Sequence, residues 1–386
     1  MSSIEQKRNE QLYLLAFSLY LPLMVLRTSF YAAFINGIMI KIVSAICLAL
    51  LGILELRQFK LDRRDIIGLL MTGIVAYAIF VTSLKMEVLN VLFIFCARKI
   101  NFKRIAKYAF VITSVCCLFV FISAKVGWIQ NYIEYTSSRG HREYLGFSYS
   151  LYLPAMLFNI IALYIYLHGG LRPVPALLFS FITFYVYKAT DSRLSAMTTL
   201  LLIAVVLLQQ YIPRFMHNKL FLFLEKYAFV IFAAFFILIT MLYDPNKTLF
   251  AKLDGLFTGR LWNGHIGLKE YGIPLMPQFI KFVGNGLSEL GYKETGSYFY
   301  LDSMYVKLLI NCGVIAFTTV MLSLQGVMNH LSKKKKYLCL VIGAFIALRC
   351  MVDDLSFNIY YNTFAIAIGS ILYRSFDSNN KEIKHD

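Results

Sequence analysis

The sequence predicts an all-α, polytopic integral membrane protein with about twelve transmembrane helices and a long extracellular loop between helices 9 and 10. Of its 386 residues, 59% are hydrophobic and only 15% are charged, and the mean hydropathy is +0.65. Apolar runs also recur along the whole chain. A spanning helix needs about 20 mostly apolar residues, because the hydrocarbon core is about 30 Å thick and a helix rises about 1.5 Å per residue.

Twelve apolar runs are long enough to be interpreted as spans. The fourth is short, and Asp353 and Asp354 interrupt the last pair, so eleven or thirteen spans remain open. No small-residue cleavage site follows the first run, which is therefore expected to be a retained helix. No repeat or Gly/Ser linker divides residues 1–386, so a single membrane domain is predicted. The spans are 11–26, 36–54, 66–82, 84–97, 109–124, 151–167, 174–190, 196–212, 228–243, 304–327, 338–352 and 358–372.

The distribution of basic residues predicts the topology. If the N-terminus lies inside, the inner segments hold 22 of the 38 Lys and Arg residues, and the short outer loops and outer helix ends hold eight. Cytoplasmic loops are enriched in Lys and Arg. Both termini are therefore expected in the cytoplasm, with segments 130–150 and 244–303 outside as the predicted active-site face. Loop 244–303 is too apolar for disorder and is expected to form short helices that close over a cavity.

Composition also excludes some classes of site. The net charge of +17 is spread in short islands between apolar runs, which is typical of membrane loops and not of a nucleic-acid surface. The seven cysteines lie in or beside apolar runs, without a CxxC or Cys/His cluster. Neither a disulfide framework nor a zinc site is expected. The chain also lacks the DxD spacing of a metal clamp, so no metal or cofactor is predicted.

Four outer arginines are candidates for anion binding: Arg139, Arg142, Arg193 and Arg260. A single outer arginine is usually an interfacial anchor whose head group reaches the lipid headgroups. Four that converge on one cavity would instead suit a pyrophosphate, because the guanidinium is a planar fork that matches phosphate oxygens bidentately.

Asp302 is the leading candidate for a catalytic base, because it stands at the outer end of the tenth span. An aspartate just before a helix can also act simply as an N-cap, together with Ser303. His265 and His141 are competing bases. No carboxylate lies at a predicted span centre, which disfavours an ion-coupled transporter without excluding it.

Taken together, these motifs resemble the Wzy-type O-antigen and capsular-polysaccharide polymerases. The resemblance rests on Arg139, Arg142, Leu145-Gly146-Phe147, Ser192-Arg193, Gly259-Arg260, Asp302, Tyr305 and Gly313-Val314. Many members of that family have His-Pro-Asn where this chain has Ser148-Tyr149-Ser150, and an Asp-Asn pair where it has Asp302-Ser303. In the related O-antigen ligases, a histidine lies near the position of Asp302.

The resemblance implies a metal-independent glycosyltransferase in the bacterial cytoplasmic membrane. Its donor and acceptor would be oligosaccharide repeat units linked to undecaprenyl pyrophosphate, and its partners the bilayer, a flippase and a chain-length regulator. The four arginines and Tyr305 would bind substrate, with Asp302 or His265 catalytic. The alternatives are an O-antigen-type ligase and a flippase that transports lipid-linked oligosaccharides.

Overall fold

The computed structural model describes residues 3–59, 62–82, 87–136, 140–212, 218–293 and 295–372. The chain is mostly helical. The helices of the first half are α1 (Ser3–Arg27), α2 (Gly37–Gln58), α3 (Arg63–Val81), α4 (Val88–Cys96), α5 (Phe102–Val126), α6 (Tyr152–His168), α7 (Pro173–Thr190) and α8 (Arg193–Tyr211). Those of the second half are α10 (Lys219–Lys226), α11 (Ala228–Met241), α12 (Thr248–Leu256), α13 (Arg260–Tyr271), α14 (Met304–Lys307), α15 (Gly313–Lys333), α16 (Tyr337–Arg349) and α17 (Ala367–Leu372).

Among the described residues, six helices are long and apolar enough to cross a membrane: α1, α2, α3, α5, α8 and the continuous α14–α15 segment Met304–Lys333. A seventh results if α10 and α11, which meet at a bend of 68°, count as one span. Helix length therefore supports a multi-pass membrane protein but does not confirm twelve spans. Helix α4, for example, has nine residues and at about 1.5 Å per residue cannot cross the hydrocarbon core.

The outer faces of the long helices carry exposed aliphatic side chains. On α2, Ile38, Ile42 and Ile46 are 67%, 54% and 43% exposed, and their spacing of four residues places them on one face of the helix. In water such a stripe would be unfavourable, whereas lipid covers it at no cost. The opposite faces pack inward, as where Tyr13, Phe17 and Tyr20 of α1 surround Phe93 of α4.

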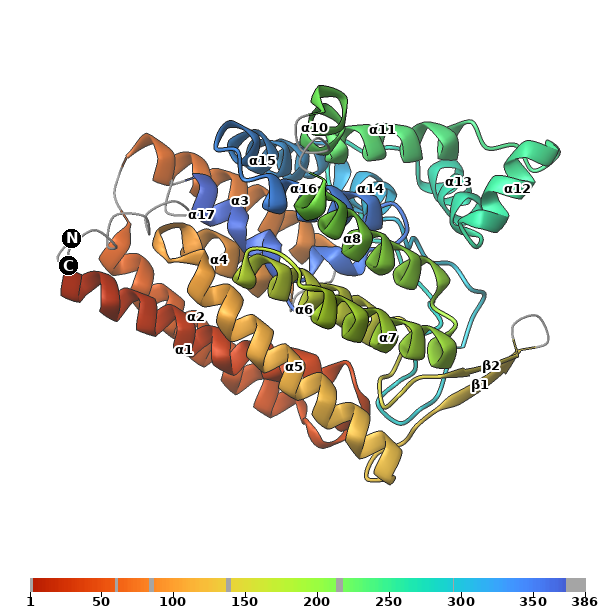
Figure 1. The fold of residues 1–386 in the computed structure, drawn as a ribbon, viewed down its shortest axis with the longest axis horizontal. Helices are drawn as coiled ribbons and strands as arrows, with labels where there is room; N and C mark the ends of the chain where they lie inside the picture. Colours follow the sequence, from red (N-terminus) through yellow and green to blue (C-terminus); the bar gives the residue numbers. More distant parts are fainter. Residues whose placement is uncertain are drawn as a thin grey trace.

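One two-stranded sheet departs from the all-α prediction. Strands β1 (Ile133–Thr136) and β2 (Gly140–Glu143) form an antiparallel hairpin within the predicted outer segment 130–150. Figure 1 shows this hairpin, α12 and α13 gathered toward one end of the molecule, while α17 and the first turns of α1 lie toward the other. The two segments predicted to share an outer face thus lie at the same end.

The long loop 244–303 is helical only in its first half. It forms α12 and α13, whereas residues 272–293 and 295–303 contain no helix. This second part packs against a π-helical turn at Leu308–Cys312 of the spanning segment, where Gln278 N donates to Asn311 O at 2.9 Å. Gly313 ends that turn with φ of 80°, and a Cβ there would lie 2.7 Å from the Met276 backbone. A glycine is therefore required where the loop and the helix touch.

A buried ion cluster ties three elements together at the end where α17 lies. The Arg98 side chain is fully buried and donates to both carboxylate oxygens of Glu55 on α2, at 2.6 and 2.7 Å. Its Nε also donates to Asp65 on α3 at 3.1 Å. The two carboxylates therefore hold the Arg98 side chain inside the fold.

Candidate functional site

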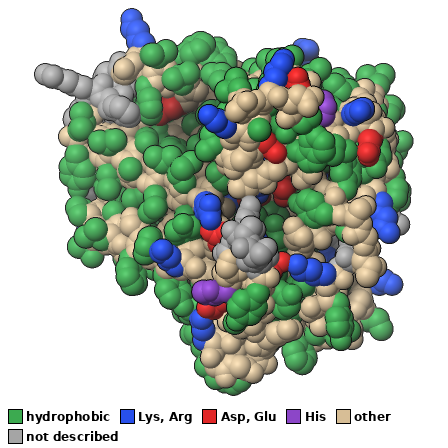
Figure 2. All heavy atoms as spheres, turned by 90° about the vertical axis from the view of Figure 1, so that its right-hand side faces the viewer, with side chains coloured by type: hydrophobic (Ala, Val, Ile, Leu, Met, Phe, Trp, Pro, Cys, Tyr) green, Lys and Arg blue, Asp and Glu red, His purple; other side chains and the backbone are tan. Residues whose placement is uncertain are grey.

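A cavity of about 860 Å³ opens at the end of the molecule that carries the hairpin and α13. Figure 2 looks onto this end and shows basic and acidic side chains around a hollow. The cavity walls come from the hairpin, the start of α6, the α7–α8 junction, α13, the loop before α14 and the turn after α16. Segments far apart in the sequence thus form one polar site.

The hairpin directs Arg142 into this cavity. Its register pairs Glu134 with Arg142 and Tyr135 with His141, and side chains alternate between the two faces of a strand. Arg142 is therefore buried and lines the cavity, while His141 is exposed. The Arg142 guanidinium donates from Nε to Thr190 O at 3.1 Å and from Nη2 to Ser150 Oγ at 2.6 Å.

Arg260 is held by backbone carbonyls at the start of α13. Thr258 and Gly259 have φ of 54° and 85°, so the chain turns sharply into the helix. The Arg260 Nε donates to Val352 O at 2.7 Å, and Nη1 donates to Phe257 O at 3.2 Å and to the Thr258 hydroxyl. Its Nε lies 3.8 Å from the Asp302 carboxylate. An arginine fixed in this way has lost its side-chain freedom before any ligand binds.

Arg193 is held more loosely at the mouth of the same cavity. Its side chain is 65% exposed, and its Nε lies 3.1 Å from Asp191 Oδ1. It opens α8, whose first turn has no side-chain cap. The positive end of the helix dipole therefore lies beside Arg193 at the cavity wall and favours an anion there.

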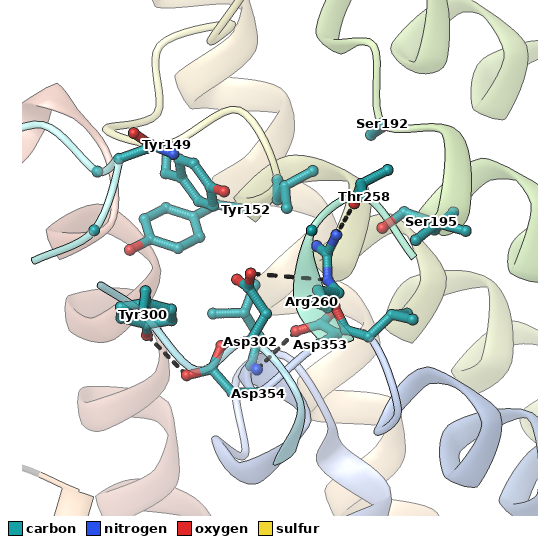
Figure 3. Close-up of a pocket in the computed structure, with 18 of the residues that line it drawn as sticks. Tyr149, Tyr152, Ser192, Ser195, Thr258, Arg260, Tyr300, Asp302, Asp353 and Asp354 are labelled. Atoms are coloured by element: carbon teal, nitrogen blue, oxygen red, sulfur yellow. Dashed lines mark hydrogen bonds and ion pairs between the residues drawn. The ribbon is translucent and has the colours of Figure 1, made fainter. Parts of the chain in front are cut away.

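Asp302 lies among groups that control its charge. Figure 3 shows Tyr149, Tyr152 and Tyr300 on one side of it and Arg260 on the other. Its pKa is raised to about 6, and burial is the largest cause. Arg260 and Lys307 act against the rise, while Asp354 and Asp353 add to it. No described residue hydrogen-bonds its carboxylate. A cavity-facing carboxylate with a pKa of about 6, whose ion pair with Arg260 is too long for a hydrogen bond, is suited to general base catalysis.

The capping role considered for Asp302 is not what the structure shows. The N-cap of α14 is Ser303, which makes no side-chain capping hydrogen bond. The Asp302 carboxylate instead faces the cavity.

The cavity also contains charged side chains that the sequence did not single out as ligands. Among the described lining residues, five basic side chains face five carboxylates: Arg142, Arg193, Arg260, Lys293 and Arg349 against Glu134, Asp191, Asp302, Asp353 and Asp354. Glu134 pairs with Arg142 at 3.7 Å and also contacts Lys293, and Arg349 pairs with Asp353 at 2.6 Å. The site is thus a balanced set of ion pairs and not a purely basic clamp. Of these acids, the sequence indicated Asp302 as a candidate base and showed Asp353 and Asp354 as an interruption between the last two spans.

Two of the predicted site residues, His265 and Tyr305, do not line the cavity. His265 packs against α11, where its Nδ1 lies 3.3 Å from Thr240 O. Tyr305 is fully buried and donates its hydroxyl to Ala347 O at 2.8 Å, as a core residue does. Arg139 lies outside the described residues. The structure therefore brings together Arg142, Arg193, Arg260 and Asp302, but neither His265 nor Tyr305.

Aromatic side chains form much of the remaining wall, and the cavity offers no arranged metal ligands. Tyr149, Tyr152, Tyr298, Tyr300, Phe282 and Trp262 all line it. No group of three His, Cys, Asp or Glu side chains among the described residues is placed to hold a metal ion. Fixed arginines, a titratable carboxylate and aromatic rings together suit a ligand that carries both phosphate and sugar groups.

Comparisons with known proteins identify no relative of this chain. No family model, no curated protein and no solved structure matches it.

Proposed function

We propose that this protein polymerises oligosaccharide repeat units linked to undecaprenyl pyrophosphate, as a metal-independent glycosyltransferase on the outer face of the bacterial cytoplasmic membrane. The single observation that carries the proposal is the Arg260–Asp302 arrangement, in which a fixed guanidinium and a carboxylate with a pKa of about 6 lie side by side in one cavity. The proposal includes twelve spans, cytoplasmic termini and an outer loop at 244–303.

In the proposed reaction, the acceptor hydroxyl attacks the anomeric carbon of the donor sugar. A new glycosidic C–O bond forms as the bond from that carbon to the pyrophosphate oxygen breaks, with inversion. The hydroxyl proton passes to the Asp302 carboxylate. Arg142 and Arg260 stabilise the charge that develops on the leaving pyrophosphate.

The ion pairs help to hold the two arginines in place at the site. The Glu134 carboxylate lies 3.7 Å from Arg142 Nη1, and the Asp302 carboxylate lies 3.8 Å from Arg260 Nε. Both distances are too long for a good hydrogen bond. A phosphate at hydrogen-bonding distance would form stronger contacts with Arg142 Nη1 and Arg260 Nη2, which donate to no other described residue. The arginines are thereby desolvated and oriented before the substrate arrives.

The experiment that tests this proposal is incubation of the purified protein with lipid-linked repeat units isolated from cells that lack it. Ladders of increasing chain length on the lipid carrier support a polymerase. If the protein is a polymerase, loss of its gene would leave single repeat units displayed outside the cell. If it is a ligase, loss of the gene would leave long chains on the lipid carrier. No ladder in vitro, with repeat units accumulating inside the cell, would refute the proposal in favour of a flippase.

A transporter is the second candidate, and one observation favours it. Lys307 lies in a spanning segment and pairs with Asp354 at 2.6 Å, and both line an inner chamber together with Glu87. Ionisable groups inside membrane proteins often mark ion or proton paths. Proton flux into liposomes that depends on the oligosaccharide lipid would identify such a transporter.

A further inference from the structure

A second chamber of about 160 Å³ lies beside the main cavity. The residues that line both spaces form the partition between them: Tyr152, Tyr300, Asp354 and Leu355. On the far side of the partition, the chamber is lined by Lys307 and Glu87, among others. Nothing in the proposed reaction uses these two groups.

Lys307 is held firmly against the partition. Its Nζ donates to Asp354 Oδ2 at 2.6 Å and to the Tyr300 hydroxyl at 3.1 Å, and Tyr300 donates to the same Asp354 oxygen at 2.8 Å. Its side chain is 15% exposed and that of Asp354 is 14% exposed. The ammonium also lies 4.5 Å from the centre of the Tyr300 ring. A cation at this depth is stable only when it is paired, so Lys307 and Asp354 depend on each other.

The chamber is polar enough to hold water. Asn311 lies on the π-helical turn, is 1% exposed, and has a side-chain oxygen with no hydrogen-bond partner among the described residues. Buried polar atoms in a space of this kind are usually satisfied by ordered water. The charges of the chamber lie directly behind the wall that Tyr300 and Asp354 form against the main cavity.

The charged groups that face Asp302 come from three elements. Arg260 on α13 and Lys307 on α14 supply two cations, while Asp353 and Asp354 in the turn after α16 supply two carboxylates. The hydroxyls of Tyr149, Tyr298 and Tyr300 complete its surroundings. Without Lys307, two carboxylates and a single cation would remain, which favours the neutral, protonated form of Asp302.

We propose that Lys307 is a positioning residue for the proposed glycosyl transfer: through its contacts with Asp354 and Tyr300 it keeps Asp302 ionised and ready to accept a proton. The inference rests on the proposed role of Asp302 as the base. Lys307 itself does not touch substrate, because the partition separates it from the main cavity.

The experiment measures the protonation of Asp302 without any substrate. A hydrophobic carbodiimide reacts with protonated carboxyl groups, so labelling of the Asp302 peptide in the full-length protein is followed by mass spectrometry from pH 5 to 9. Asp302→Asn shows which label belongs to this site. In Lys307→Met the pH of half-labelling should rise by about one unit. In Asp354→Asn it should fall, and Lys307→Arg should behave like the wild type.

An unchanged half-labelling pH in Lys307→Met, or a rise in Asp354→Asn, would overturn the inference. If Lys307→Met does not fold, the other two variants still test the inference. The half-labelling pH should fall in Asp354→Asn and stay at the wild-type value in Lys307→Arg. The outcome is independent of the proposed function: expected labelling shifts in a protein that makes no polymer would refute the polymerase and leave the charge coupling intact.

Discussion

Replacement of Arg260 by glutamine should change both the rate of the proposed reaction and its pH dependence. The Arg260 Nε lies 3.8 Å from the Asp302 carboxylate, and both side chains are largely buried. At an effective dielectric constant of about 20, two unit charges at this distance attract by about 4 kcal/mol. Since one pH unit corresponds to about 1.4 kcal/mol, the upper bound of the shift is about three units. Because the site relaxes, the pKa of Asp302 should rise by about one to three units.

The sign follows from the role of the carboxylate. Asp302 must be ionised to accept a proton, so wild-type activity should be lost as the pH falls through about 6. Without the neighbouring cation, the pKa of Asp302 rises and activity should be lost at a higher pH. Loss of the contact to the pyrophosphate should also lower the maximal rate about 10²–10³-fold.

The assay is the pH–rate profile of polymer formation from a lipid-linked repeat unit, with Arg193→Gln as the matched control. Arg193 is 65% exposed and pairs with Asp191, not Asp302. Its loss should reduce the rate without moving the acid limb of the profile. Thermal unfolding would first show that Arg260→Gln is folded. An unshifted acid limb in that variant would then refute the coupling of Arg260 to Asp302.

The remaining predictions test other parts of the structure. Asp302→Asn should fold normally and make almost no polymer; near-normal synthesis would remove its role as a base. Arg142→Lys loses the hydrogen bonds to Thr190 O and Ser150, so the polymerisation rate should fall about 10²-fold, and a rate within threefold of wild type would argue against a phosphate contact. His265→Ala should keep its activity, because His265 does not line the cavity; inactivity in a folded protein would restore it as a candidate base. Tyr305→Phe loses a 2.8 Å hydrogen bond and should lower stability by about 1 kcal/mol with little effect on turnover, as thermal unfolding and the same assay would show. Arg98→Met leaves the buried Asp65 and the partly buried Glu55 without their main partner and should destabilise the protein by about 3–5 kcal/mol, so an unchanged thermal midpoint in detergent would contradict the buried cluster.

The sequence by itself determined the class of the protein and much of its candidate site. Runs of apolar residues predict helices locally, because burial in lipid depends on composition over about 20 residues. Arg142, Arg193, Arg260 and Asp302 were identified as charged residues on the predicted outer side, and the structure places all four around one cavity. Their common location follows from topology, since residues at the same end of spanning helices are brought to one face.

Only the tertiary structure decided which way each side chain points and what it meets. His265 and Tyr305 belong to the expected segments, but the packing of their helices turns them toward α11 and α16. The sequence also could not predict the partners of the arginines. Arg260, for example, donates a hydrogen bond to Val352 O, 92 positions away. Apolar character predicts that a helix forms but not its rotation about its own axis, which is set by the neighbours against which it packs. Ion pairs depend on that rotation, so the charge balance of the cavity and the partition at Lys307 emerged only when distant helices packed together.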